Sequence, residues 1–149
     1  MVTLVDPYGH QVVKAFLTKE ECETIAPKLL RDEHKILRIP NSSTTSYKGT
    51  TKQFQVYNIL THGDIRPLNI PQRFLDLPQL QHLDELWIQG WVNITHLNED
   101  IPKHTHNGIG QPEQGLIACS VYLQGHGAHY THFEDTGKTL NIVGDLHLV

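Results

Sequence analysis

Two histidines separated by a single residue could hold a metal ion: His104 and His106, in the stretch KHTHNGIG at 103–110. In a β-strand, residues i and i+2 point to the same face, so both imidazole rings could converge on one ion. A facial metal site needs three ligands and keeps further positions open for substrate. The same spacing also fits two polar side chains on a solvent-facing strand, and the two residues alone leave both interpretations open.

Histidine is also abundant elsewhere: the chain has eleven histidines, and seven of them lie between His96 and His147. Three occur in the stretch GHGAHYTHF, where neighbouring glycines disfavour a helix. We interpret these three as exposed turn residues, or one of them as a residue at the mouth of a pocket. His147 alternates with Leu146 and Leu148 on an expected strand, which predicts either a half-buried side chain on the polar face or a third metal ligand. The clustered histidines are His126, His129 and His132.

The composition is that of one globular domain of 149 residues, with 38% hydrophobic and 19% charged residues. A net charge of −4 argues against a protein that binds the phosphate backbone of nucleic acids. No apolar stretch approaches the roughly 20 residues of a membrane-spanning helix. The N-terminus carries no secretory signal, so we expect a cytoplasmic protein without membrane contact. Cys22 and Cys119 match no metal-binding spacing and are expected to be two buried free thiols.

The N-terminal half is expected to hold short strands, a helix and loops. Thr18 and Glu21 form a capping-box pattern, and the apolar residues that follow recur at helical spacing, which predicts a helix over 19–31. Pro27 inside that helix should bend it or split it into two turns. Short strands are expected at 2–5 and 11–16, a polar loop at 40–53, a strand or short helix at 54–60, and two short helical pieces within 74–86.

From residue 85 onwards the sequence has the pattern of short β-strands. ELWIQGWVNITHL alternates with period two and places Trp91, Asn93 and Thr95 on one face. LIACSVYLQG predicts a mostly buried strand, and HYTHFED and KTLNIVGDLHLV predict two more. Several short strands joined by turns favour a β-sandwich or barrel. The expected organisation is a single domain at 1–149, made of a helical and loop support region at 1–84 and a β core at 85–149.

Four short motifs occur in order along this β region: WVNI, HTH, CSVYLQG and NIVGDLHL. Together they make the chain resemble the 2-oxoglutarate- and Fe(II)-dependent oxygenases, specifically a small prolyl-hydroxylase-like branch with His-x-His in place of the more usual His-x-Asp. The resemblance covers residues 85–149 and, more loosely, YKGTTKQFQVYNIL upstream. It implies a mainly β fold with N-terminal helices. The β core would be a double-stranded β-helix of the jelly-roll or cupin type, in which two sheets form a squashed barrel with iron at one end.

The resemblance also implies roles for individual residues. His104 and His106 would be the first two Fe(II) ligands. Tyr122 matches the tyrosine whose hydroxyl binds the distal carboxylate of the co-substrate 2-oxoglutarate in prolyl-hydroxylase-like members. A phenol can donate a short hydrogen bond to a carboxylate while its ring stays in an apolar wall; the alternative is a tyrosine packed in a sheet with its hydroxyl at the rim. Asn93 and Thr95, on the strand before the histidine pair, are further candidates for residues that face the cofactor pocket.

Two features depart from the family's pattern. His106 stands where most members have a carboxylate, which leaves Fe(II) with its full charge until dianionic 2-oxoglutarate binds. The distal histidine and a carboxylate-binding arginine are expected beyond the GDLHL strand, whereas the sequence ends at Val149. His147 could replace the distal ligand only in a different register. We therefore expect a C-terminally incomplete barrel, in a chain that is part of a longer protein, is completed by another chain, or does not turn over. An open strand edge would also favour a homodimer.

The activity implied by the resemblance is hydroxylation of a peptidyl residue or a small molecule, with 2-oxoglutarate converted to succinate and CO₂. The polar segment at 41–53 is interpreted as a lid over the substrate or as an ordinary surface loop. Two other classes stay open: a cupin-like metal enzyme that needs no 2-oxoglutarate, and a non-catalytic β-sandwich binding module with surface histidines.

Overall fold

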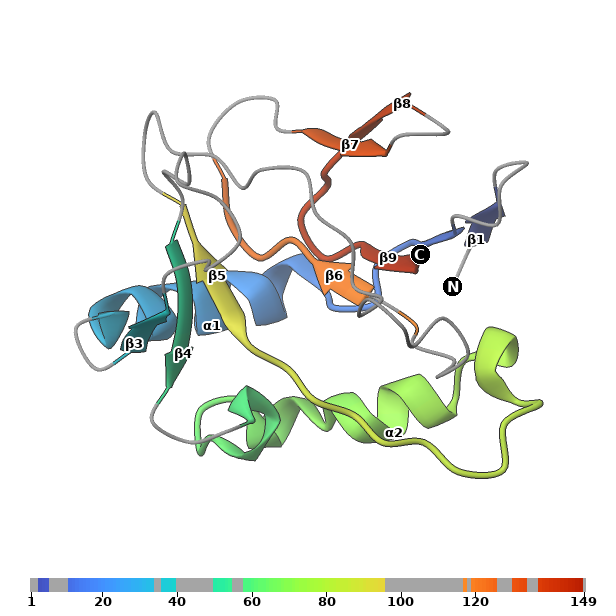
Figure 1. Ribbon diagram of the computed structural model, residues 1–149, viewed down its shortest axis with the longest axis horizontal. Coiled ribbons are helices and arrows are strands. Elements are labelled where there is room, and N and C mark those ends of the chain that lie inside the picture. The colour runs from blue at the N-terminus through green and yellow to red at the C-terminus, as the bar shows by residue number, and fades with distance from the viewer. Residues whose placement is uncertain are drawn as a thin grey trace. The chain divides into compact units, whose positions relative to one another are not determined.

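Short antiparallel sheets and a few helices make up the chain in the computed structural model of Figure 1. The structure describes residues 3–5, 11–33, 36–39, 50–54, 58–95, 117, 119–125, 130–133 and 137–148. Contacts divide the chain into two compact units: unit 1 is Met1–Ala26 with His104–Val149, and unit 2 is Pro27–Lys103. The boundary between them therefore falls inside a helix, immediately before Pro27.

The helices and strands within the described residues are short. The helices are α1 (Lys19–Arg31) and α2 (Ile70–Leu75), with the 3-10 turns η2 (Ile59–Thr61), η3 (Arg66–Leu68) and η4 (Pro78–Leu80). The strands are β1 (Thr3–Val5), β2 (Gln11–Val13), β3 (Ile36–Ile39), β4 (Thr50–Phe54), β5 (Val92–Ile94), β6 (Cys119–Val121), β7 (Tyr130–Phe133), β8 (Gly137–Leu140) and β9 (Leu146–Leu148).

Unit 1 is built on a four-stranded antiparallel sheet with the strand order β1-β2-β9-β6. Strand β9 lies inside this sheet, and all three of its side chains are buried. His147 of β9 is paired with Val12 of β2 on one side and with Ser120 of β6 on the other. The first strands of the sequence and its last strand therefore share one sheet. The antiparallel pair β1 and β2 confirms strands at Thr3–Val5 and Gln11–Val13, whereas residues 14–16 of the strand expected at 11–16 lie in a turn.

Helix α1 begins with the capping box that the sequence predicts. Thr18 N–H donates to Glu21 Oε2 at 2.8 Å, and Glu21 N–H donates to Thr18 Oγ1 at 3.1 Å, so two backbone donors at the helix start are satisfied. Pro27 is exposed, and α1 continues past it to Arg31, so a split into two turns is wrong. Packing of residues on both sides of Pro27 holds the helix together despite the missing N–H donor. The buried face consists of Cys22, Ile25, Ala26 and Leu29.

The turn before β9 depends on Gly144. Its backbone has a φ of +90°, in the left-handed region, and a Cβ at this position would collide with the Leu17 carbonyl oxygen. Gly144 N–H donates to the Tyr122 carbonyl at 2.9 Å, and the Gly144 carbonyl accepts from Leu17 N–H at 3.0 Å. The lack of a side chain thus lets this turn bind both the end of β6 and the segment that leads into α1.

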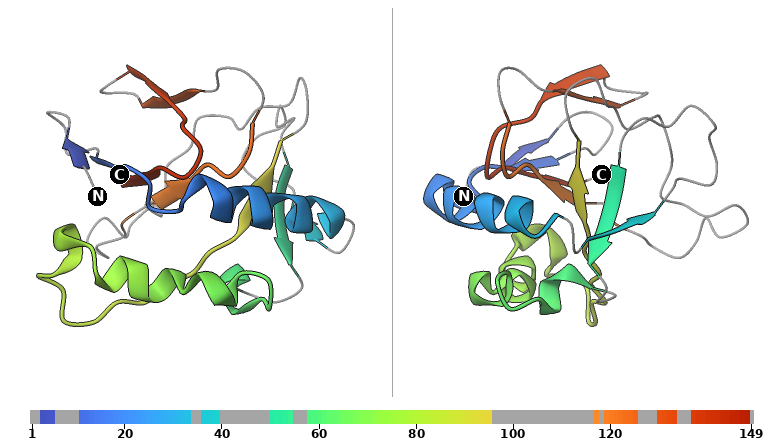
Figure 2. Two further views of the ribbon diagram at one scale, coloured as in Figure 1. Left: turned by 180° about the vertical axis from the view of Figure 1, so that it is seen from behind. Right: turned by 90° about the vertical axis from the view of Figure 1, so that its left-hand side faces the viewer.

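Strands β7 and β8 form a separate two-stranded hairpin in unit 1. Figures 1 and 2 show it standing apart from the four-stranded sheet. Tyr130 is paired with Leu140, and Lys138 Nζ lies 3.8 Å from the centroid of the Tyr130 ring, a cation–π contact. His132 on β7 is exposed, as one interpretation of the histidine cluster predicts, whereas His126 and His129 lie outside the described residues.

Unit 2 combines a three-stranded antiparallel sheet, with the order β3-β4-β5, and the helical turns from η2 to η4. Asn58 connects the two parts of this unit. Its Oδ1 accepts from Leu60 N–H at 3.1 Å and from Gly90 N–H at 3.0 Å. Its Nδ2 donates to the Ile88 carbonyl at 2.8 Å. One amide side chain thus fixes η2 against the segment that leads into β5. The buried apolar residues of this unit are Leu29, Ile59, Ile65, Ile70, Leu77, Leu80 and Ile94.

The structure differs from the local predictions in several places. KTLNIVGDLHLV, predicted as one strand, contributes to two strands, β8 and β9, which the Gly144 turn separates. Residues 50–53, within the predicted loop, belong to β4, where threonines suit a strand that pairs on both sides. In the described part of the predicted strand, 85–95, only Val92–Ile94 is paired, because Gly90 bonds to Asn58 and Ile59 instead of to a neighbouring strand. Strand β6 is not mostly buried, since its first two residues, Cys119 and Ser120, are exposed.

Of the two helical pieces predicted within 74–86, η4 lies inside that range, whereas α2 begins at Ile70 and reaches the range only with its last two residues. Pro71 and Pro78 each stand in the first turn of a helix, where a missing N–H costs nothing, so the prolines start these helices and do not break them.

The overall class is mixed, with few helices and small antiparallel sheets, and the described strands form no closed barrel. In the part of the chain that the structure describes, no helix has the length and apolar character needed to cross a membrane.

Replacement of Gly144 should destabilise unit 1. Gly144→Ala should lower the free energy of unfolding by more than about 2 kcal/mol, because a left-handed φ costs an alanine roughly 1–2 kcal/mol and the methyl group also meets the Leu17 carbonyl. Urea unfolding followed by circular dichroism measures the loss.

Two other glycines separate the causes of that loss. Gly137→Ala has the unfavourable φ of +82° but open space around the new methyl group, so it should cost only about 1 kcal/mol. Gly63→Ala adds a methyl group in open space without a left-handed φ and should be nearly neutral. Equal losses for Gly144→Ala and Gly137→Ala would contradict the steric part of the argument.

Candidate functional site

The predicted metal ligands His104 and His106 lie outside the residues that the structure describes. The other residues assigned to the same site from the sequence are described: Tyr122, Asn93 and the alternative ligand His147. Tyr122 and His147 belong to unit 1, whereas Asn93 belongs to unit 2. Within unit 1, the structure brings Tyr122 and His147 into the same sheet region.

Tyr122 directly follows β6 and is half-buried. Burial raises the pKa of its phenol above the ordinary value, so the hydroxyl keeps its proton at neutral pH. Gly125 leaves room for this hydroxyl, because a Cβ there would collide with Tyr122 Oη. A protonated, partly desolvated phenol is a suitable donor to an anionic oxygen, which fits the role that the resemblance implies.

His147 is only 2% exposed, so its predicted half-buried position on a polar face is wrong. The sheet explains the difference, since β9 has a strand on each side and buried side chains along its whole length. The leucines on either side of His147, Leu146 and Leu148, are buried as well. This histidine therefore lies in the core of unit 1.

Asn93 lies on β5, paired with Thr51 of β4, and is exposed. Its neighbours Trp91 and Thr95 are also exposed, whereas Ile94 is buried, so the predicted alternation of faces is confirmed. The carboxamide of Asn93 is open to solvent and is available to a ligand on this face of unit 2.

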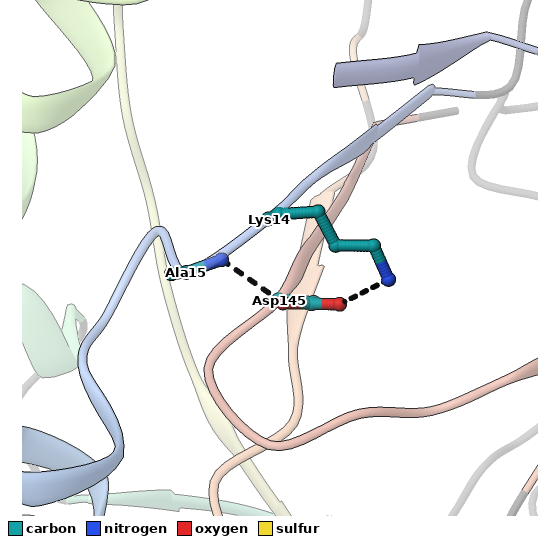
Figure 3. A network of polar contacts seen from close by, with 3 residues as sticks. All are labelled: Lys14, Ala15 and Asp145. Atoms are coloured by element: carbon teal, nitrogen blue, oxygen red, sulfur yellow. Dashed lines mark hydrogen bonds and ion pairs between the residues drawn. The ribbon is translucent and has the colours of Figure 1, made fainter. Parts of the chain in front are cut away.

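A buried carboxylate follows Gly144 in the same turn. Asp145 Oδ2 accepts from Lys14 Nζ at 2.9 Å, and Oδ1 accepts from Ala15 N–H at 2.9 Å (Figure 3). Ala15 has a φ of +52°, which is costly for alanine, so the hydrogen bond from its N–H helps to hold that conformation. The Gly-Asp-Leu part of the fourth motif thus has a structural role, because it fastens the end of β2 to the start of β9.

The two cysteines have different environments. Cys22 is buried, but Cys119 is exposed on β6, so the prediction of two buried thiols holds for Cys22 alone. Although the Cys119 residue is exposed, partial desolvation of its thiol raises the pKa to about 11. Desolvation by burial also raises the pKa of Cys22. Both thiols therefore stay protonated at neutral pH, which argues against a nucleophilic role for either.

Comparisons with family models, curated proteins and solved structures give no match to this chain. The resemblance to the oxygenases therefore rests on the order of four motifs in the sequence. The described contacts bear on two of these motifs, because β6 and β9 carry them and are neighbours in one sheet.

A second group of side chains that could bind a metal ion lies in unit 2, and the sequence alone does not predict it. It consists of Asp32, His62 and Asp64, whose donor atoms all lie within 4.8 Å of one another. The His-x-Asp spacing at 62–64 is a signal that could have identified two of the three residues. Asp32 comes from a different segment, and only the fold brings it to the other two.

The Asp145 carboxylate should matter mainly for stability. Asp145→Ala should lower the free energy of unfolding by about 2–3 kcal/mol, because Ala15 N–H and the Lys14 amine lose a buried acceptor. Asp145→Asn keeps an acceptor for Ala15 N–H and should cost about 1 kcal/mol. Urea unfolding compares the two variants. Equal losses would show that the charge opposite Lys14, and not the bond to Ala15, accounts for the effect.

Proposed function

We propose that this chain is an Fe(II)- and 2-oxoglutarate-dependent dioxygenase with a double-stranded β-helix fold, which hydroxylates a peptidyl residue or a small molecule. The observation that carries the proposal is the pairing of two motif segments: β6, in CSVYLQG, is hydrogen-bonded to β9, in NIVGDLHL. The bond from Gly144 N–H to the Tyr122 carbonyl adds a contact between the same two motifs beyond the strands. Antiparallel pairing of strands that are distant in sequence is what a jelly-roll sheet requires.

In this proposal, His104 and His106 hold the iron. Imidazole nitrogen suits Fe(II), and two imidazoles leave further coordination positions for the co-substrate and O₂. When iron and 2-oxoglutarate are bound, they would supply an oxidative decarboxylation that consumes O₂. This reaction is coupled to hydroxylation of a C–H bond and yields succinate and CO₂. The side chains of the protein fix the position of the metal, orient the co-substrate and exclude water.

Tyr122 orients the co-substrate in this proposal. Its hydroxyl donates a hydrogen bond to the distal carboxylate of 2-oxoglutarate and keeps the proton on Oη, since burial raises the pKa of the phenol. Gly125 is part of the same arrangement because its lack of a Cβ preserves the position of the hydroxyl.

Anaerobic addition of Fe(II) and then 2-oxoglutarate tests the iron site. The chain should develop a visible metal-to-ligand charge-transfer band, and the His104→Ala/His106→Ala variant should not, because it lacks both proposed ligands. His132→Ala is the matched control, since it removes an exposed histidine of β7 and should leave the band unchanged. A band that survives the double substitution would contradict the assignment of ligands. No band in any variant would contradict an oxygenase site in this chain.

Two substitutions test Tyr122 without touching the metal ligands. Tyr122→Phe removes the hydroxyl, and Gly125→Ala displaces it. Both should weaken binding of 2-oxoglutarate by about tenfold or more, because a hydrogen bond to a charged group contributes roughly 1.5–3 kcal/mol. Titration of the charge-transfer band with 2-oxoglutarate measures the change. Tyr130→Phe, on the exposed hairpin, is the control. Unchanged affinity in Tyr122→Phe would show that Tyr122 is only a packing residue.

A further inference from the structure

Three donor side chains from two distant segments of unit 2 converge on one another. Asp32 follows the last residue of α1, and His62 and Asp64 come from the turn after η2. Their ligand atoms all lie within 4.8 Å of one another, and His62 Nδ1 is 3.9 Å from Asp64 Oδ2. The three side chains are 13%, 26% and 30% exposed, in sequence order, so they are partly shielded but still reachable from solvent.

The backbone holds the turn that carries His62 and Asp64 at both of its ends. His62 N–H donates to the Ile59 carbonyl at 3.0 Å, and the His62 carbonyl accepts from Ile65 N–H at 3.0 Å and Arg66 N–H at 2.9 Å. Ile59 and Ile65 are both buried, which anchors the turn in the core of unit 2. The positions of the His62 and Asp64 backbones are therefore fixed before any ligand arrives.

The third donor is held by the end of α1. Asp32 N–H donates to the Lys28 carbonyl at 3.1 Å, which extends the helical hydrogen bonding by one residue. A helix C-terminus carries partial negative charge, so Asp32 adds a carboxylate to a region that is already negative. Arg31 Nε is 3.8 Å from Asp32 Oδ1, and the Arg31 side chain is mostly exposed, so this ion pair by itself contributes little.

His62 lies against the turn that carries Asp64. Asp64 N–H donates to His62 Nδ1 at 3.3 Å, a long hydrogen bond that keeps the ring beside the Asp64 backbone. Imidazole nitrogen is a common ligand of divalent metal ions.

We propose that Asp32, His62 and Asp64 form a divalent-cation site in unit 2 that is separate from the iron site and does not rest on the proposed function. Two carboxylates and one imidazole form a mixed oxygen and nitrogen donor set, which suits Mn²⁺, Fe²⁺ or Zn²⁺ better than Mg²⁺ or Cu⁺. Ligands at about 2.1 Å from one ion are at most about 4.2 Å apart, so donors within 4.8 Å need to move by only a fraction of an ångström. The bound ion joins the end of α1 to the η2 turn.

Mn²⁺ titration followed by electron paramagnetic resonance tests the site, in the His104→Ala/His106→Ala background so that the proposed iron ligands are absent. This variant should bind about one Mn²⁺ per chain in a saturable manner. Adding His62→Gln or Asp64→Asn should weaken the binding at least tenfold, because each removes a direct ligand of similar size. His82→Gln and Asp76→Asn are the controls, since both residues are exposed and belong to the same unit.

Thermal unfolding provides a second readout that needs no substitution at Asp32, His62 or Asp64. In the His104→Ala/His106→Ala background, Mn²⁺ should raise the unfolding temperature as its concentration rises, because the ion binds the folded state. Absence of saturable Mn²⁺ binding in this background would overturn the proposal, as would binding that His62→Gln and Asp64→Asn leave unchanged. Absence of the charge-transfer band in the unsubstituted chain, with Mn²⁺ binding at Asp32, His62 and Asp64 retained, would count against the oxygenase alone.

Discussion

Hydrogen bonds from the Gly144 backbone and the Asp145 carboxylate join the turn before β9 to two segments that are distant in sequence, the end of β6 and residues 14–17. Gly144 binds the end of β6 through Tyr122 and the approach to α1 through Leu17, and Asp145 binds the end of β2 through Lys14 and Ala15. The left-handed backbone of Gly144 brings the chain close enough to Leu17, and the start of β9 then carries Asp145 to Ala15. The turn leads into β9, whose place between β2 and β6 puts His147 in the core.

The sequence predicts well those elements that are stabilised by interactions between residues close together in the chain. Helix α1 has the predicted bounds because the Thr18 and Glu21 side chains cap it and its apolar residues repeat every three to four positions. Non-local pairing is what the sequence pattern misses. The threonines of β4 predict a polar loop when the sequence is considered alone. In the structure they belong to a strand that pairs with a neighbour on each side. Likewise, His147 looks like a polar-face residue because nothing near it in the sequence reveals that β2 and β6 enclose β9.

The two proposed sets of metal ligands differ in how their members lie along the chain. His104 and His106 stand out in the sequence because two identical ligands lie two residues apart, yet their geometry lies outside the described residues. Asp32, His62 and Asp64 do not stand out in the sequence, because Asp32 follows a helix and the other two lie in a distant turn. The fold brings their donor atoms together. A pattern search finds ligands that are neighbours in sequence, whereas ligands gathered from separate segments require the tertiary structure.

The strand order of unit 1 has a consequence for how the chain acquires its fold during synthesis. Lys14 and Asp145 are 131 positions apart, and β2 receives β9 as a neighbour only after the intervening chain has been made. At typical translation rates that interval is on the order of ten seconds. Throughout it, the hairpin of β1 and β2 has an edge that awaits its native partner. Sheets of such high contact order also close slowly. Correct folding of this chain therefore competes with mispairing on the ribosome, and chaperones that shield a nascent strand would raise its yield.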